Sequence, residues 1–333
     1  MKPAIILIGS LFLAFTNQAQ DRLKVVATAT MFEDMARMIS GDLLEVVSIV
    51  PVGGDPHIYE PTPSDVRLVA EADLILRNGL TFEGWLDELI ANSGTKADVV
   101  TITKGIPPIA SDQYHNATDP HAWMSAHNGL QYIENIHDAL VRLDPQNEDI
   151  YTFNYRLYKQ QLEDLDQWIR TEIEKIPLAK RVLITSHDAF RYFGKAYGVR
   201  VEAALGTSTD AEVQTSDIIK LSNTIRETGV PAIFVESSVN PKLLQQIARD
   251  NKIGIGGKLY SDSLGDKDSP AGSYLGMLRH NTETIVKALS AKVQETHTEA
   301  ASLNKSSSVW LWVTLLSLLI GGFAFVAFRL GRK

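Results

Sequence analysis

The chain has 333 residues, of which 44% are hydrophobic, and a formal net charge of -8. This length supports two core-bearing domains of roughly 100 to 200 residues each and excludes a single small module. The negative charge argues against a nucleic acid as partner. Cysteine is absent, which excludes disulfides, thiolate metal ligands and a lipid attached to an N-terminal cysteine. Any bound metal must therefore be held by nitrogen and oxygen atoms.

Both ends of the chain carry apolar segments. Residues 1–20 combine one lysine, a short apolar run and a polar end, which is typical of a signal peptide cut after Ala19 or Gln20. Residues 309–328 contain no charge, and a helix rising about 1.5 Å per residue crosses a bilayer over this length. Trp310 and Trp312 lie at the outer edge of this span, and the basic tail 329–333 follows it on the cytoplasmic side. We therefore expect an exported protein anchored to the plasma (inner) membrane by a C-terminal transmembrane helix, with its body in the periplasm or outside the cell.

Strand and helix patterns alternate between residues 21 and 143. The predicted strands are 23–29, 44–50, 73–77 and 99–102, and the predicted helices include 31–39, 82–92 and 128–143. Thr62 followed by Pro63 indicates the start of one more helix, and Asn128 is the expected cap of the last. This alternation is typical of a parallel sheet flanked by helices. Residues 21–143 are thus predicted to form a first α/β lobe.

A long helix is predicted within the linking segment 144–177. Residues 146–176 lack glycine and proline, and apolar side chains recur there at three- and four-residue steps, so a helix of about 30 residues would run about 45 Å. A second α/β lobe is predicted at 178–293. Its strands are expected at 181–185, 199–203, 232–235 and 253–259, and its helices at 189–197, 216–228, 241–251 and 272–293. Residues 294–308 are small, polar and serine-rich, which indicates a linker to the membrane span.

Four side chains suited to metal binding follow predicted strands. The carboxyl ends of strands in open α/β sheets are where such folds present groups to a ligand. Two of the four fall in each half, so an ion that they share would lie between the lobes. Taken singly, each has an ordinary explanation as a loop, turn or capping residue. The four candidates are His57, His121, His187 and Asp262.

The sequence around these residues resembles the zinc- and manganese-specific substrate-binding proteins of ABC importers. The motifs that carry the resemblance are GDPHIYEPTPSD at 54–65, DPHAW at 119–123, SHDAFRYF at 186–193, VESSVNPK at 235–242 and LYSDSLG at 259–265. The resemblance extends over about 23–293 with the motifs in the family's order. It implies two similar α/β domains, with parallel sheets flanked by helices, linked by one long rigid helix, and it implies a binding protein rather than an enzyme.

The family's metal ligands fall on His57, His121, His187 and Asp262 of this chain. The resemblance therefore implies that a monomer captures one Zn²⁺ or Mn²⁺ ion in an interdomain cleft and delivers it to an ABC permease and its ATPase. Release is expected when the permease pulls the Asp262 side of the cleft away from His57 and His121.

The sequence leaves open which ion is the cargo. In the resembling family the third ligand is histidine or glutamate, and glutamate is typical of manganese members, so His187 favours zinc or mixed binding. Three imidazoles suit zinc, whereas a bidentate Asp262 would raise the coordination toward what manganese prefers. Zinc-specific relatives carry a long histidine-rich loop, but residues 111–118 contain only His115, which weakens a zinc-only interpretation.

Further residues are candidates for supporting the ligands. A ligating imidazole usually donates its other N–H to a carboxylate or carbonyl. The candidate carboxylates are Glu60, Asp119, Asp188 and Glu236, and a role as a helix cap or surface residue explains each of them about as well. Tyr59 and Trp123 are expected to pack around the site. The other histidines have no motif around them and are interpreted as surface or packing residues: His115, His127, His137, His280 and His297.

Two other functions are compatible with a metal-binding chain. A zinc hydrolase needs three protein ligands, an open water position and a general base, and four candidate ligands without a His-Glu-x-x-His segment argue against it. A surface adhesin would hold its ion permanently, whereas a transport protein exchanges it. Family members are more often free in the periplasm or lipid-anchored, so we expect the C-terminal span to replace the lipid anchor.

Overall fold

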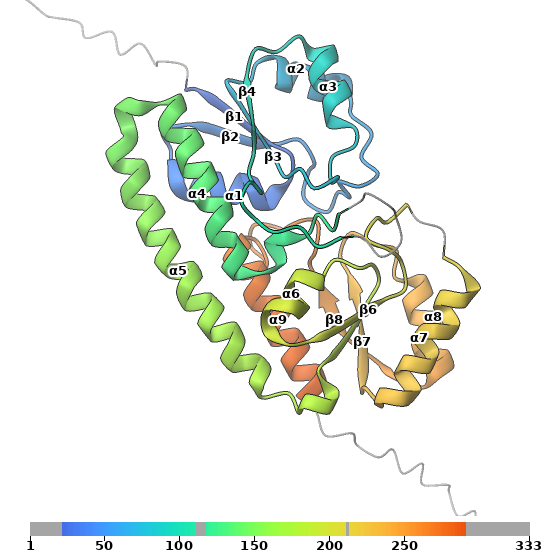
Figure 1. Cartoon of the computed structure of the whole chain (residues 1–333). Helices are drawn as coiled ribbons and strands as arrows, with labels where there is room; N and C mark the ends of the chain where they lie inside the picture. Colours follow the sequence, from blue (N-terminus) through green and yellow to red (C-terminus); the bar gives the residue numbers. More distant parts are fainter. Residues whose placement is uncertain (1–21, 111–117, 211–212, 291–333) are drawn as a thin grey trace, which may run out of the picture. The chain divides into compact units, whose positions relative to one another are not determined.

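The computed structural model describes residues 22–110, 118–210 and 213–290, and these belong to one compact unit (Figure 1). The predicted signal peptide, linker, membrane span at 309–328 and cytoplasmic tail lie outside the described residues. Within the described ranges, no helix is both long and apolar enough to cross a membrane.

Strands and helices alternate through both halves, which confirms the predicted α/β class. The elements of the first half are β1 (Lys24–Ala27), α1 (Thr30–Ser40), β2 (Glu45–Ser48), α2 (Pro63–Ala70), β3 (Leu74–Arg77), α3 (Leu86–Ser93), β4 (Asp98–Thr101), the 3-10 turn η1 (Ala122–Met124) and α4 (Ala126–Leu143). A short turn η2 (Pro145–Asn147) leads into α5 (Glu148–Glu174), and η3 (Leu178–Lys180) follows it. The second half contains β5 (Val182–Thr185), α6 (Arg191–Tyr197), β6 (Arg200–Ala203), α7 (Thr215–Thr228), β7 (Ala232–Glu236), α8 (Lys242–Asn251), β8 (Gly254–Leu259) and α9 (Tyr274–Ser290).

The strands of the two halves follow the same order. The first sheet is parallel with the order β2-β1-β3-β4. In the second half β5 pairs with β6, and β7 pairs with β8, again in parallel. Because β5 also contacts β7, these pairs lie side by side in the order β6-β5-β7-β8. Each half therefore repeats one arrangement, in which its first strand lies inside the sheet.

Both faces of the sheets are buried, as expected for parallel strands covered by helices. Side chains alternate along β1, where Val25 and Ala27 enter a large core while Val26 enters a smaller one under α2 and α3. In β5, Leu183 enters the large core, and its neighbours Val182 and Ile184 pack under α7 and α8. The large core includes residues from α1, α4, α5, α6 and α9 as well as both sheets. It is therefore continuous across the two halves of the described chain.

The long helix predicted between the halves is confirmed as α5, which has 27 residues and is therefore about 40 Å long. It lies beside α4 and also contacts α1 and α9 (Figure 1). Its buried positions Tyr151, Tyr158, Leu162, Leu165, Ile169 and Ile173 form one stripe, which matches a 3.6-residue period. Through this stripe α5 contributes to the core shared by both halves.

Two local predictions were wrong. The cap of α4 is Ser125, not Asn128: Ser125 has an extended backbone, and its hydroxyl accepts the N–H of Asn128, which lies in the first turn. The helix predicted from residue 82 begins at Leu86 with Trp85 as its N-cap, and Phe82 and Glu83 lie before it without helical structure. The cap at Thr62 is confirmed, since Asp65 accepts from the Thr62 N–H at 2.7 Å.

Candidate metal centre

The four candidate ligands lie on four separate loops. His187 follows β5 after one intervening residue, and Asp262 follows β8 closely, so the two parallel strands aim these side chains toward the same edge. His57 and His121 lie farther from β2 and β4, on the long segments that precede α2 and η1. The expectation that all four directly follow strands therefore holds only for the second half.

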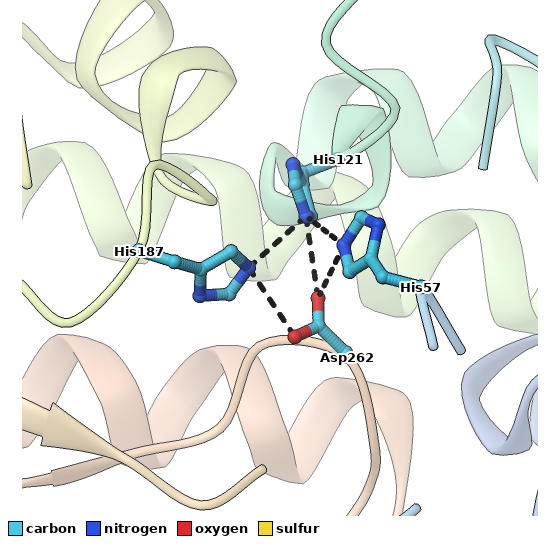
Figure 2. A group of neighbouring side chains, drawn as sticks. All are labelled: His57, His121, His187 and Asp262. Atoms are coloured by element: carbon cyan, nitrogen blue, oxygen red, sulfur yellow. Dashed lines mark hydrogen bonds and ion pairs between the residues drawn. The ribbon is translucent and has the colours of Figure 1, made fainter. Parts of the chain in front are cut away.

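These four side chains converge at one point (Figure 2). One nitrogen or oxygen from each lies within 4.8 Å of the others. Nε2 of His121 is 3.1 Å from Nε2 of His57 and 3.3 Å from Nε2 of His187. Oδ1 of Asp262 is 3.3 Å from Nε2 of His121 and 3.9 Å from Nε2 of His57, while its Oδ2 is 3.3 Å from Nε2 of His187. The side chain of His57 is 4% exposed and the other three are fully buried.

Three imidazoles around one carboxylate have strongly shifted pKa values. Burial lowers the pKa of His57 to about 3, and the charges of His121 and His187 act in the same direction. Burial also opposes the charge on His121, but Asp119 and Asp262 outweigh it and raise its pKa to about 9. Despite burial, Glu236 and Asp262 hold the pKa of His187 well above its usual range, and the histidines hold that of Asp262 well below. A cation binding here must displace protons from His121 and His187.

Asp119 supports His121 from the side opposite the cluster. Its Oδ1 lies 2.8 Å from Nδ1 of His121 and also accepts the His121 backbone N–H at 2.9 Å. A proton held on Nδ1 leaves the lone pair of Nε2 directed at the centre. The predicted supporting role of Asp119 therefore has the geometry that it requires.

Glu236 occupies the equivalent position beside His187. Its Oε1 accepts the His187 backbone N–H at 2.8 Å. Its Oε2 lies 2.7 Å from Nδ1 of His187, an ion-pair contact outside the angular range of a hydrogen bond. Each half thus supplies one histidine backed by one buried carboxylate.

The carboxylate of Asp262 is held on one side only. Its Oδ2 accepts from the hydroxyls of Ser238 and Ser261 at 3.0 and 3.2 Å. Its Oδ1 is buried and has no hydrogen bond among the described residues. In the metal-free protein the protonated ring of His121, 3.3 Å away, offsets the charge of this buried oxygen, and a bound cation would take its place.

Residues on both sides of Asp262 are bonded to the first half. The indole N–H of Trp123 donates to the Ser261 carbonyl at 2.8 Å, and the N–H of Gly53 donates to the Ser263 hydroxyl at 2.7 Å. Gly53 has a φ of 78°, which a residue with a side chain adopts only at a cost. The Leu264 N–H donates to the Thr30 hydroxyl at 2.9 Å. These bonds hold the Asp262 loop against the two ligands of the first half.

His57 is positioned by its own loop and by an aromatic ring. Asp55 accepts the His57 N–H at 3.0 Å and the Thr209 hydroxyl at 2.6 Å, so it joins this loop to the second half. The indole N–H of Trp85 donates to the carbonyl of Pro56 at 2.8 Å. Phe82 meets the His57 ring edge-on with centroids 5.1 Å apart. Packing of this kind limits the access of water to the cluster.

Other residues singled out from the sequence have different roles. Trp123 packs against His121 as expected, with ring centroids 5.2 Å apart. Tyr59 instead packs on Trp85 and donates to Asp65. Glu60 is exposed, and Asp188 lies 3.7 Å from Arg191, so of the four candidate carboxylates Asp119 and Glu236 are the two that contact an imidazole. The remaining histidines divide as follows: His127 is exposed, His137 stacks on Tyr155, His280 packs on Tyr260, and His115 and His297 lie outside the described residues.

Several supporting residues were missed from the sequence. Asp55 and the two serines that bond Asp262 lie inside the quoted motifs, so their position beside a ligand was a usable signal. Phe82 had been assigned to a helix, whereas it lies before α3 and its ring meets that of His57.

Known proteins resemble this chain over most of its length. Residues 25–288 match the family model described as zinc-uptake complex component A, periplasmic. The manganese-binding lipoprotein MntA of Halalkalibacterium halodurans is 35% identical over 275 residues, which cover 83% of this chain and 91% of that protein. The manganese ABC transporter substrate-binding lipoprotein PsaA of Streptococcus pneumoniae is 36% identical over 282 residues, covering 82% and 91%.

Solved structures resemble this chain in both fold and sequence. The periplasmic zinc-binding protein TroA from Treponema pallidum superimposes with a TM-score of 0.77 at 34% identity, covering 80% of this chain and 99% of that one. The Mn-bound periplasmic metal-binding protein from Candidatus Liberibacter asiaticus gives a TM-score of 0.74 at 32% identity, covering 80% and 100%. The matched family and relatives are substrate-binding proteins of metal importers, so the protein is a binding protein and not an enzyme. The family model and the relatives cover most of the chain, and the chain belongs to the family of the periplasmic zinc-uptake complex component A.

Proposed function

We propose that this chain is the extracytoplasmic solute-binding protein of a metal ABC importer. It captures one Zn²⁺ or Mn²⁺ ion with His57, His121, His187 and Asp262 and delivers it to the permease, which its ATPase drives. The observation that carries the proposal is the convergence of one atom from each ligand within 4.8 Å, with Oδ1 of Asp262 buried and without a hydrogen bond among the described residues. No contact of the described residues favours a hydrolase.

The surroundings of Asp262 bear on the choice of metal. Its Oδ2 already accepts two hydroxyl hydrogen bonds, which leaves Oδ1 as the oxygen with free lone pairs. Three Nε2 atoms and one oxygen make a four-coordinate set, which is the arrangement that zinc prefers. If Oδ2 also binds, the site gains a fifth ligand and suits manganese better. We therefore propose that zinc binds more tightly, with manganese as a second cargo.

The long helix and the shared core support a small closing motion. In this proposal 21–143 and 178–293 are two metal-binding lobes joined by the segment 144–177, and the protein acts as a monomer. A wide hinge motion would expose the core that α5 shares with both sheets, at about 25 cal/mol for each Å² of apolar surface. A small displacement is enough to separate Asp262 from His57 and His121, because the ligand atoms lie only 3.3 and 3.9 Å apart. Release therefore requires the loss of the bonds that Trp123 and Gly53 make to the Asp262 loop.

The proposed location rests on the ends of the sequence. We propose that residues 1–20 direct export and that a helix at 309–328 anchors the protein to the membrane beside its permease. The test is a truncation that ends at Ser307, expressed in the native host and fractionated. The truncated protein should leave the membrane fraction, and its retention there would refute anchoring by this helix.

The function is tested by a competitive calorimetric titration of zinc and manganese into the purified full-length chain. We expect one ion per chain. The variant His187→Ala should lose binding, because it removes a fully buried ligand. His127→Ala serves as the matched control, since His127 is exposed on α4, and it should bind like the unmodified chain. Absence of binding of either ion by the unmodified chain would overturn the proposed function.

A further inference from the structure

A short antiparallel pair lies next to the metal centre. Ala110 and Thr118 form an isolated antiparallel bridge, and the Asp119 N–H donates to the Ile109 carbonyl at 2.8 Å. In such a pair, residues in the position of Ile109 and Asp119 exchange two hydrogen bonds with each other. Here the bond from the Asp119 N–H to the Ile109 carbonyl is present, but the Ile109 N–H does not donate directly to the Asp119 carbonyl.

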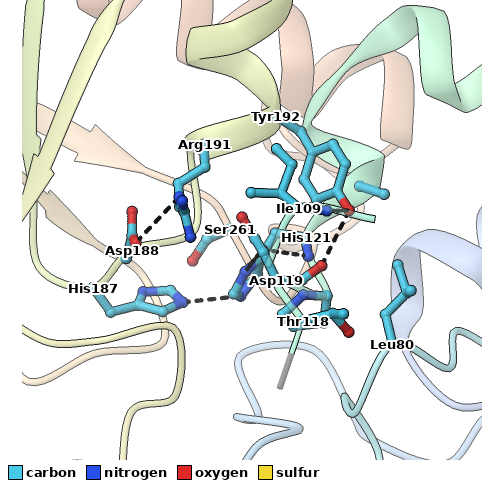
Figure 3. A network of polar contacts seen from close by, with 12 residues as sticks. Leu80, Ile109, Thr118, Asp119, His121, His187, Asp188, Arg191, Tyr192 and Ser261 are labelled. Carbon is cyan, nitrogen blue, oxygen red and sulfur yellow. Dashed lines mark hydrogen bonds and ion pairs between the residues drawn. The ribbon is translucent and has the colours of Figure 1, made fainter. Parts of the chain in front are cut away.

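The hydroxyl of Tyr192 takes the place of the second bond (Figure 3). It accepts the Ile109 N–H at 3.1 Å and donates to the Asp119 carbonyl at 3.3 Å. Tyr192 is 4% exposed, and burial raises its pKa, so the hydroxyl keeps the proton that it donates. The phenol thus bridges two backbone groups in a place that a direct bond would otherwise fill.

Tyr192 belongs to the opposite half from the pair that it bridges. It lies in the first turn of α6, five residues after His187, while Ile109 and Asp119 belong to the segment that leads to His121. Its neighbour Arg191 makes a parallel contact, donating to the Ala110 carbonyl at 2.9 Å. Asp119 in turn holds Nδ1 of His121. A continuous path of contacts therefore joins the loop of the third ligand to the ring of the second.

We propose that Tyr192 is a positioning residue of the metal centre. By bridging Ile109 and Asp119 across the two halves, it keeps Asp119 where its carboxylate orients His121 toward His187 and Asp262. This inference rests on the proposed function and names a residue that touches no candidate ligand. Coupling of this kind is reciprocal, so an ion that binds better with the bridge intact must also stabilise the bridge.

The variant Tyr192→Phe tests this role because it removes the hydroxyl and keeps the ring. The Ile109 N–H and the Asp119 carbonyl then lose their partner and must close on each other or recruit water, which moves Asp119. Zinc dissociation from the full-length protein, followed with a competing chelator, should become roughly tenfold faster. The gain in melting temperature on adding zinc should also shrink.

Tyr151→Phe is the matched control. Tyr151 is also buried, and its hydroxyl donates to Asp144 at 2.6 Å, but it lies on α5, which supplies no candidate ligand. Both variants should lower the melting temperature of the metal-free protein, and only Tyr192→Phe should speed zinc release. Equal dissociation rates in the two variants and the unmodified chain would refute the positioning role. A failure of the unmodified chain to bind zinc would instead refute the proposed function, and this inference with it.

Amide hydrogen exchange in the unmodified chain provides a test that needs no variant. The Ile109 N–H has the Tyr192 hydroxyl as its acceptor, whereas the Asp119 N–H has a backbone carbonyl. By the reciprocity above, zinc should slow the exchange of the Ile109 amide as well as that of Asp119. An Ile109 amide whose exchange is the same with and without zinc would contradict the inference.

Discussion

Replacing Glu236 by glutamine removes the charge that faces Nδ1 of His187 and keeps the shape of the side chain. Glu236 is 3% exposed, with Oε1 2.8 Å from the backbone nitrogen of His187 and Oε2 2.7 Å from Nδ1. Both of these nitrogens are donors when Nε2 binds a metal. A glutamine has one acceptor oxygen, so its NH₂ group must face one of the two donors. The imidazole of His187 then turns away or changes tautomer.

The expected loss of zinc affinity is about 10- to 100-fold, equivalent to about 1.4 to 2.8 kcal/mol, which is the range for a residue that orients a metal-binding histidine. A chelator competition at constant pH measures it. Asp144→Asn is the control, because Asp144 is 5% exposed and accepts from Tyr151 at a place that holds no candidate ligand. An unchanged affinity in Glu236→Gln, or an equal loss in Asp144→Asn, would show that Glu236 does not orient His187.

Four further predictions concern the same cluster. Zinc affinity should rise between about pH 6 and 9, because His121, with a pKa of about 9, must lose a proton before it binds. Calorimetry in buffers of different ionisation enthalpy counts the released protons. A zinc affinity that does not change with pH would contradict this prediction. Between about pH 6.5 and 9 the metal-free protein should lose stability to urea, since the raised pKa values of His121 and His187 stabilise the fold only while these rings are protonated, and His57, whose pKa is lowered, is neutral there in both the folded and the unfolded chain. At a zinc concentration about 1,000 times Kd, chelation should lower Tm by roughly 8 to 16 °C, and a change of less than about 2 °C would refute binding to the folded state. Ser238→Ala should raise the affinity for manganese relative to zinc by roughly threefold or more, because Oδ2 of Asp262 loses a donor at 3.0 Å. Titration of both metals measures the ratio of the two affinities. An unchanged ratio would show that Oδ2 does not contribute to the choice of metal.

Local patterns were sufficient for most of the fold. Alternation along β1 and β5 and the apolar stripe of α5 arise from the geometry of strands and helices themselves, so they are visible in the sequence. The prediction of a helix cap failed where two nearby residues of similar type were available and the folded backbone decides between them. Ser125 rather than Asn128 caps α4, because capping requires an extended backbone at the cap, and residue type alone does not specify it.

The supporting carboxylates show the same limit. Three of the four candidates, Glu60, Asp119 and Asp188, lie close to a ligand in the sequence, but only Asp119 and Glu236 reach Nδ1 of a histidine. Glu236 comes from β7, 49 residues after the histidine that it contacts. Distance along the chain therefore did not separate these two from Glu60 and Asp188.

By itself the sequence determined the α/β class, the long helix and the identity of the four candidate ligands, because each depends on local periodicity or on a short motif. The tertiary structure alone decided that Asp119 and Glu236 orient two of the histidines, that serine hydroxyls occupy Oδ2 of Asp262, and that Tyr192 bridges Ile109 and Asp119. These contacts join residues on different loops, and their positions depend on how two sheets and α5 share one core. No local pattern encodes a distance between loops, since such a distance arises only when the whole chain has packed.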